Sequence, residues 1–172
     1  MSEMITDLLQ FSTLDQQINI ETINLKSLIK ETLTRIDTQI QEAQATIKME
    51  ESCDQKISVD KTLFMNVIQN LVANAIIYCK EEELPVISIS AVSDATKITI
   101  HIADNGIGIE EPFQDKVFEM FKRLKTKKVD GTGIGLASCK KIVEFHNGKI
   151  AVDSTVGVGS TFSIQLPVRN EG

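Results

Sequence analysis

Two segments of this chain alternate apolar and polar side chains along their length, "VISISAV" at 86–92 and "KITIHIAD" at 97–104. A period of two predicts β-strands with one buried face, and the short connection "SDAT" predicts that they form an antiparallel hairpin. A second pair, "KIAVDS" and "GSTFSIQLP", follows near the C-terminus with "TVGV" between its members. A sheet of this kind has one apolar face that another layer must cover.

Helical patterns predict the covering layer. Apolar residues at 25, 28, 29, 33, 36 and 40 form one stripe of a long helix. Asp60 is a suitable N-cap for a second helix over about 61–79. "GLASCKKIVEFH" predicts a third helix that ends at "NG", with Gly148 suited to a left-handed C′ position. The predicted fold class is therefore α+β: a two-layer sandwich in which helices cover one face of a mixed, mostly antiparallel sheet.

The N-terminal third of the chain has weaker patterns. Residues 2–15 resemble the end of an amphipathic helix, whereas "STLDQQINIETINL" is interpreted as a link into the next element. "ATIKMEE" and "QKISVD" are predicted to be short strands.

Charge and composition exclude several classes of protein. A net charge of −6 over 172 residues repels nucleic acid and anionic membranes, and no apolar run approaches the roughly 20 residues that cross a bilayer. The three cysteines, Cys53, Cys79 and Cys139, have no paired spacing, and the two histidines lie far apart. These features predict reduced thiols, no zinc site and a cytoplasmic location, with no nucleic-acid partner and no membrane contact by this chain.

The predicted helix at 61–79 contains a row of amides. Asn66, Asn70 and Asn74 follow one another at four-residue intervals, so they share a face that adjoins core-type side chains. An unpartnered amide on a buried face costs a few kcal/mol. The amides therefore have partners inside the protein or face a polar ligand, and a plain polar helix face is the alternative.

Two glycine-containing segments indicate that the backbone approaches a ligand closely. "DNGIGIEEP" comes directly after a predicted strand, and "GTGIGLASCKK" opens a predicted helix, whose free N–H groups favour phosphate. Neither is a Walker P-loop, because G-x-x-x-x-G-K-[ST] is absent. Neither is the dinucleotide fingerprint, because Glu111 stands where the third glycine should be and no strand precedes the second segment. Taken singly, each segment could be two tight turns.

In their order along the chain, "QNLVANA", "DNGIGI", "VFEMFKRL", "GTGIGLASCKKIVEFHNGKI" and "GSTFSIQLP" resemble the nucleotide boxes of the ATP-binding catalytic domain of sensor histidine kinases. That domain belongs to the GHKL superfamily, together with type II topoisomerase, mismatch-repair and heat-shock ATPases. The resemblance covers residues 20–169. The sequence from "FKRLKTK" to "GTGIGLA" is most similar to that of phytochrome-like and hybrid sensor kinases. Residues 1–19 resemble the end of the second dimerisation helix with its linker, and residues 170–172 form a tail.

The resemblance implies a binding site for ATP and Mg²⁺. Asn74 corresponds to the magnesium ligand and Asn70 to a second candidate ligand, and both would face the nucleotide cleft. Asp104 corresponds to the carboxylate that accepts a hydrogen bond from the adenine amine, and Tyr78 to an aromatic side chain that packs on the base. The other positions that the resemblance places around the nucleotide are Gly106, Gly108, Ile109, Phe121, Gly131, Thr132, Gly133, Gly135, Leu136 and Thr161.

The resemblance also implies phosphotransfer rather than hydrolysis. Arg123 corresponds to an arginine of the lid, which would steady the γ-phosphate, and Phe118 and Phe121 to the aromatic pair that packs the lid. Hydrolysing relatives carry glutamate where this chain has Asn70, and an amide cannot serve as a general base near neutral pH. Asn70 and Arg123 are therefore the expected catalytic residues. The lid, residues 109–133, has further positive charge on Lys122, Lys125, Lys127 and Lys128.

Two features depart from the family pattern. Ile77 stands where the family usually has a basic residue that touches the phosphates, and the phosphoacceptor histidine is absent, because His101 lies in a predicted strand and His146 at a helix end. We therefore expect a C-terminal piece of a longer, homodimeric kinase, which could have a membrane anchor upstream. Its phosphate would pass to a histidine on a dimerisation helix absent from this chain, and then to a response regulator receiver domain. The alternatives are a hydrolysing GHKL ATPase, a degenerate domain that serves as a scaffold, and a serine-kinase anti-sigma relative.

Overall fold

The computed structural model describes residue 5 and residues 17–119 and 134–169. Most of the segment 2–15, predicted to be the end of a helix, lies outside the described residues. The described elements follow one another in this order: β1 Ile20–Asn24, α2 Leu25–Arg35, α3 Asp37–Glu42, β2 Thr46–Met49, the 3₁₀ turn η1 Glu51–Cys53, β3 Lys56–Asp60, α4 Lys61–Ile77, β4 Val86–Ser93, β5 Lys97–Asp104, α5 Glu111–Gln114, η2 Lys116–Phe118, α6 Gly135–Phe145, β6 Lys149–Thr155 and β7 Gly159–Pro167.

A five-stranded sheet in the order β2-β4-β5-β7-β6 forms one layer of the molecule. Strand β2 is parallel to β4, and the other neighbours are antiparallel. Both predicted hairpins are confirmed, and the β4–β5 register places Ile89 opposite Ile102 and Ala91 opposite Ile100. Strands β1 and β3 pair separately as a two-stranded antiparallel ribbon.

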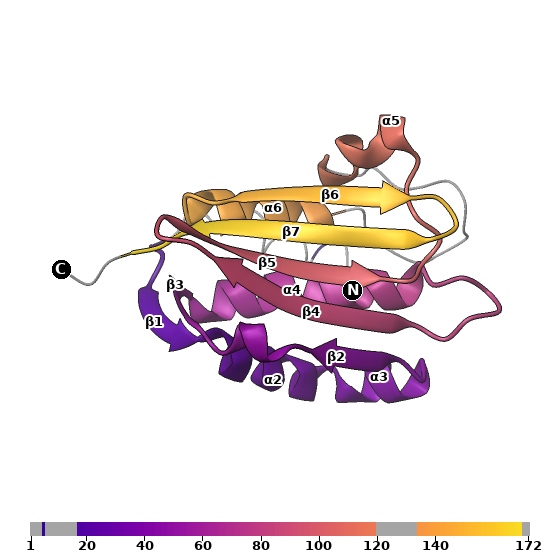
Figure 1. Cartoon of the computed structure of the whole chain (residues 1–172), viewed down its shortest axis with the longest axis horizontal. Coiled ribbons are helices and arrows are strands. Elements are labelled where there is room, and N and C mark those ends of the chain that lie inside the picture. The colour runs from indigo at the N-terminus through magenta and orange to yellow at the C-terminus, as the bar shows by residue number, and fades with distance from the viewer. Residues whose placement is uncertain (1–4, 6–16, 120–133, 170–172) are drawn as a thin grey trace.

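Helices α2, α4 and α6 form the second layer, behind the sheet in the view of Figure 1. Their apolar stripes meet the apolar face of the sheet in one core, in which Ile29, Phe64, Ile68, Ile100 and Ile164 are almost fully buried. The predicted two-layer α+β sandwich is therefore confirmed. Among the described residues, no helix is both long and apolar enough to cross a membrane.

The predicted start of α4 is confirmed, because Oδ1 of Asp60 accepts a hydrogen bond from the N–H of Leu63 at 3.1 Å.

The prediction of a single helix from residue 25 to residue 40 is wrong. At Ile36 the backbone leaves helical geometry (φ −110°, ψ 18°), and the chain starts a second helix, α3. The side chain of Ile36 is buried at this break, so the stripe continues although the helix does not.

Two further local predictions are corrected by the structure. The link predicted around residues 12–25 contains strand β1, which forms only because β3 pairs with it. The left-handed residue after α6 is Asn147 (φ 58°) and not Gly148. Gly148 is needed for another reason, since a Cβ atom there would lie 2.3 Å from the carbonyl oxygen of Gln165.

Candidate functional site

The end of helix α4 and the loop after β5 meet where β5, the central strand of the sheet, ends. Asn74 lies in the last turn of α4, and Tyr78, four residues later, is the C-cap of that helix. The carbonyl of Tyr78 accepts a hydrogen bond from the N–H of Ile107 at 2.9 Å. The loop can approach this closely because residue 106 is glycine: a Cβ atom at Gly106 would lie 2.5 Å from the carbonyl oxygen of Tyr78. The two segments therefore form a continuous surface.

Asp104 is the last residue of β5 and is held in a fixed orientation. Its Oδ1 accepts hydrogen bonds from the N–H groups of Gly106 at 2.8 Å and Ser160 at 3.3 Å. Among the described residues, nothing donates to Oδ2. Burial raises the pKa of Asp104, and the two N–H donors oppose this shift by stabilising the carboxylate. The site therefore has one oriented oxygen atom ready to accept a hydrogen bond.

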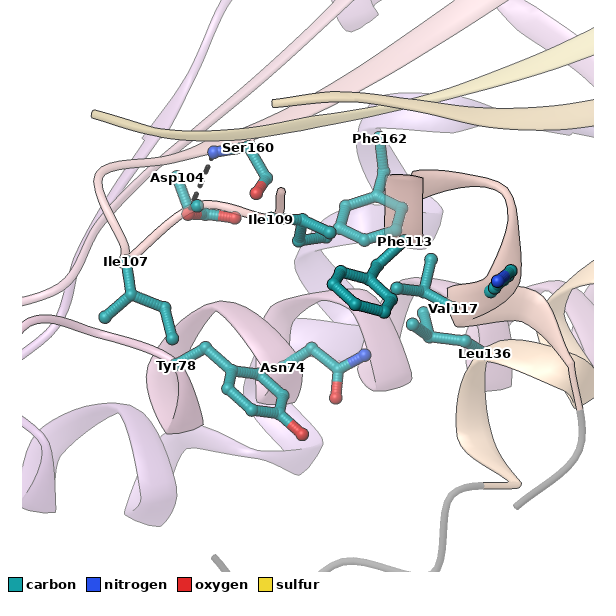
Figure 2. Close-up of a pocket in the computed structure, with 12 residues that line it drawn as sticks. Asn74, Tyr78, Asp104, Ile107, Ile109, Phe113, Val117, Leu136, Ser160 and Phe162 are labelled. Atoms are coloured by element: carbon teal, nitrogen blue, oxygen red, sulfur yellow. Dashed lines mark hydrogen bonds between the residues drawn. The ribbon is translucent and has the colours of Figure 1, made fainter. Parts of the chain in front are cut away.

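A pocket opens beside this carboxylate, and Figure 2 shows Asp104 and Ser160 on one side of it, with Asn74 and Tyr78 below and Leu136 on the far side. Of the described residues that line it, six were predicted from the sequence and six were not. The predicted ones are Asn74, Tyr78, Asp104, Gly108, Ile109 and Leu136. The others are Ile107, Phe113, Lys116, Val117, Ser160 and Phe162.

The residues missed by sequence reasoning form most of the apolar wall. Phe162 projects from β7, and Phe118 packs against it edge to face with ring centroids 6.1 Å apart. Phe113 and Val117 come from the short elements α5 and η2, whose apolar spacing is too brief to show a period. Such a wall suits a flat aromatic ligand, since aromatic side chains stack on or edge against ring systems.

The two amides of α4 that were predicted to face the nucleotide lie in different surroundings. Asn74 lines the pocket, but Asn70 lies against helix α6. A Cβ atom at Gly135 would lie 3.6 Å from Oδ1 of Asn70, so this side chain lies beside the first residue of α6. The thiol of Cys139 on the same helix donates to the carbonyl of Val67 at 3.8 Å. Burial raises the pKa of Cys139 to about 12. The role of Asn70 toward the nucleotide stays a prediction.

Thr161 is not brought into the pocket. Side chains alternate along a strand, and Ser160 and Phe162 of β7 both line the pocket, so Thr161 between them belongs to the opposite face. Ser160 is therefore the polar residue of β7 that lies at the site. The alternation in "GSTFSIQLP" could have indicated this, because Phe162 and Ile164 are its core residues.

Several predicted residues lie outside the described residues. Gly135 is described as the first residue of α6, and Ile134 precedes it as the N-cap. The predicted positions that the structure does not describe are Phe121, Lys122, Arg123, Lys125, Lys127, Lys128, Gly131, Thr132 and Gly133. Of the described lysines and arginines, Lys116 is the one that lines the pocket.

A model of the family of histidine kinase-, DNA gyrase B-, and HSP90-like ATPases matches residues 59–170. The matched segment contains every described residue that lines the pocket, from Asn74 to Phe162. The chain belongs to this family, and the predicted use of ATP agrees with a family of ATPases.

Named relatives narrow the comparison to sensor kinases. The chain is 37% identical over 170 residues to the cyanobacterial phytochrome A of Nostoc sp., a match that covers 98% of this chain and 22% of the relative. It is 38% identical over 176 residues to the adaptive-response sensory kinase SasA of Gloeothece citriformis, covering 98% of this chain and 44% of the relative. It is 35% identical over 175 residues to the sensor protein kinase WalK of Staphylococcus epidermidis, a match that covers 97% of this chain and 28% of the relative. The chain thus spans less than half the length of these relatives.

Solved structures show the same fold. The catalytic domain of histidine kinase ThkA superposes with a TM-score of 0.74 at 29% identity, covering 87% of this chain and 97% of that one. ThkA in complex with the response regulator protein TrrA superposes with a TM-score of 0.77 at 26% identity, and the match covers 95% of this chain and 46% of the ThkA chain. The resemblance to the ATP-binding catalytic domain of sensor histidine kinases is therefore confirmed.

Proposed function

We propose that this chain binds Mg²⁺ and ATP and donates the γ-phosphate to a histidine on a dimerisation helix, as the catalytic domain of a two-component sensor kinase. The observation that supports this most directly is the orientation of Asp104. One of its oxygens is held by two backbone N–H groups, and the other is left to accept the amine of adenine. The apolar wall beside it fits the ring of the base.

The phosphates would extend from the base toward helix α6. Leu136, in the first turn of α6, lies across the pocket from Asp104 in Figure 2. The N-terminus of α6 has no side-chain cap, and the unpaired N–H groups and positive dipole end of a helix favour phosphate. Lys116 adds a positive charge to the described lining, and Arg123 of the lid is proposed to act on the γ-phosphate.

Magnesium would be held by Asn74, whose amide faces the pocket. The described residues contain no cluster of three or more His, Cys, Asp or Glu side chains that could hold a metal. Mg²⁺ bound with a nucleotide does not need one, because phosphates and water supply most of its oxygen ligands. Asn70 is the second candidate ligand, since its Oδ1 lies beside Gly135 at the start of α6, toward which the phosphates are proposed to extend.

The described lining favours transfer over hydrolysis. It contains one carboxylate, Asp104, which lies at the base end of the pocket and away from α6 (Figure 2). Asn70 cannot accept a proton from water near neutral pH. Nothing in the described lining could therefore serve as a general base beside the γ-phosphate.

The acceptor histidine is proposed to belong to another helix, because neither histidine of this sequence is suited to the role. His146 is buried, its Nε2 accepts the N–H of Asp60 at 2.9 Å, and its Nδ1 donates to the carbonyl of Ile142 at 2.7 Å. His101 lies within the sheet, with Nδ1 2.9 Å from the hydroxyl of Ser163. The proposed partners are the dimerisation helices of a cytoplasmic homodimer and a response regulator, the kind of protein that is bound to ThkA.

Two measurements test this function. Calorimetric titration with ATP, with and without Mg²⁺, should show one site whose magnesium dependence is lost in Asn74→Ala and kept in Asn66→Ala, a matched amide on the same helix. Labelled γ-phosphate should then pass to a separately purified dimerisation domain of a related sensor kinase. Steady phosphate release without transfer would indicate a hydrolysing ATPase instead. Absence of ATP binding at millimolar concentration would indicate a degenerate domain and would refute the proposal.

A further inference from the structure

Ser154 lies behind the polar end of the pocket, near the end of strand β6, where it pairs with Ser160 of β7. Its hydroxyl accepts a hydrogen bond from the N–H of Ile109 at 2.7 Å and donates to the carbonyl of Gly159 at 2.9 Å. It also lies 2.7 Å from the hydroxyl of Ser160. These three contacts fill its capacity, since a hydroxyl has one donor and two acceptor positions.

This network orients the hydroxyl of Ser160. The carbonyl of Gly159 can only accept, so the proton of Ser154 lies on that hydrogen bond. In the hydrogen bond between the two hydroxyls, Ser160 must then be the donor and Ser154 the acceptor. The proton of Ser160 therefore points toward Ser154, and a lone pair of its oxygen is left for the pocket that Ser160 lines.

The polar end of the pocket consequently presents two acceptors. One is Oδ2 of Asp104, and the other is Oγ of Ser160, whose own backbone N–H helps to hold the Asp104 carboxylate. A purine with an amine at C6 supplies the donor that these atoms need. A purine with a carbonyl at C6 would place a third acceptor against them.

We propose that Ser154 is a positioning residue that makes the pocket selective for 6-aminopurine over 6-oxopurine nucleotides, because it holds the hydroxyl of Ser160 as an acceptor. This inference rests on the proposed nucleotide-binding function. The backbone around Ser154 has independent support: the side-chain amide of Gln114 donates to the carbonyls of both Ser154 and Ile109, each at 3.0 Å. Removal of the Ser154 hydroxyl should therefore leave the fold intact.

The test compares ATP with inosine triphosphate, which carries a carbonyl at C6 in place of the amine. Dissociation constants for both nucleotides with Mg²⁺ are measured by calorimetry for the wild type, Ser154→Ala, Ser154→Thr and Ser163→Ala. In Ser154→Ala the freed hydroxyl of Ser160 can rotate and donate to the carbonyl, so the preference for ATP should fall about tenfold. Two controls should keep the preference for ATP within about twofold of the wild-type value. Ser154→Thr keeps the hydroxyl, and Ser163→Ala lies on the opposite face of the sheet.

A double-mutant cycle separates positioning from a structural role. Because Ser154 acts through Ser160, adding Ser154→Ala to Ser160→Ala should change the preference no further. An equal loss of affinity for both nucleotides in Ser154→Ala, with the ratio unchanged, would overturn the inference while the nucleotide site stands. If the wild type binds neither nucleotide, the proposed function fails and this inference fails with it.

Discussion

The substitution Asp104→Asn reverses the hydrogen-bonding character of the pocket's polar end with little change of shape. Oδ1 can stay in place to accept the N–H groups of Gly106 and Ser160, which lie 2.8 and 3.3 Å away in the wild type. The atom that faces the nucleotide becomes an amide nitrogen, which donates where the carboxylate accepted. The amine of adenine would then meet another donor.

The expected cost follows from the kind of hydrogen bond that is lost. A hydrogen bond to a charged group contributes about 1.5–3 kcal/mol, and each 1.4 kcal/mol is tenfold in a dissociation constant. ATP affinity should therefore fall roughly 10- to 150-fold. Inosine triphosphate should lose less or gain, because its C6 carbonyl can accept from the new amide.

Asp104→Asn should not lower the stability of the nucleotide-free protein. Burial raises the pKa of Asp104, so the ionised carboxylate is less favourable in the folded protein than in the unfolded chain. This penalty is complete above the raised pKa and declines as the pH falls through it. The variant should be at least as stable as the wild type at pH 7, and any advantage should narrow as the pH is lowered.

Calorimetry with ATP and inosine triphosphate, together with thermal unfolding of the ligand-free proteins between pH 4 and 7, measures all three effects. Asn105→Ala, at the neighbouring residue outside the pocket lining, is the control for local damage to the loop. Unchanged ATP affinity in a folded Asp104→Asn protein would refute the assignment of this carboxylate to the base. A lower unfolding temperature for the variant at pH 7 would refute the argument from burial.

Three further substitutions test other parts of the structure. His146→Ala leaves the backbone N–H at the N-cap of α4 without its acceptor and should lower the free energy of unfolding in urea by at least about 2 kcal/mol, whereas His101→Ala, on the half-buried sheet face, should cost less. Lys116→Ala removes the positive charge from the described lining and should weaken ATP binding several-fold in calorimetry with adenosine binding unchanged; equal losses would contradict a phosphate contact. Gly108→Ala should be much more damaging to thermal stability and ATP binding than Gly157→Ala, because both glycines have similar positive φ (77° and 80°) but only at Gly108 would a Cβ atom meet a backbone carbonyl oxygen, at 2.3 Å. Equal effects of the two glycine substitutions would show that backbone strain, and not the close contact with β6, decides the outcome.

Local patterns predicted most of the fold because each depends on near neighbours in the chain. The alternation at 86–92 and 97–104 reports the two faces of a strand, and the N-cap at Asp60 needs only the N–H of Leu63. The predictions that were wrong concern features that depend on segments distant in the sequence. Strand β1 exists through its pairing with β3, and the helix predicted from residue 25 breaks at Ile36 while its apolar stripe continues.

The candidate site divides in the same way. Asn74, Tyr78 and Asp104 could be predicted because they stand in contiguous motifs beside the loops they serve. Phe113 and Phe162 belong to segments far apart in sequence, and neither segment alone indicates that the two rings share a wall.

The order of motifs along this chain was sufficient to predict its class, its layers and the carboxylate at the polar end of its pocket. The direction of individual side chains was not predictable in this way. Ser160 rather than Thr161 reaches the pocket because of the pairing of β7 with its neighbours, and Asn70 lies beside Gly135 because α6 packs beside α4. Motifs encode which groups are present, whereas strand register and helix packing set where each group points, and those depend on contacts between segments distant in sequence.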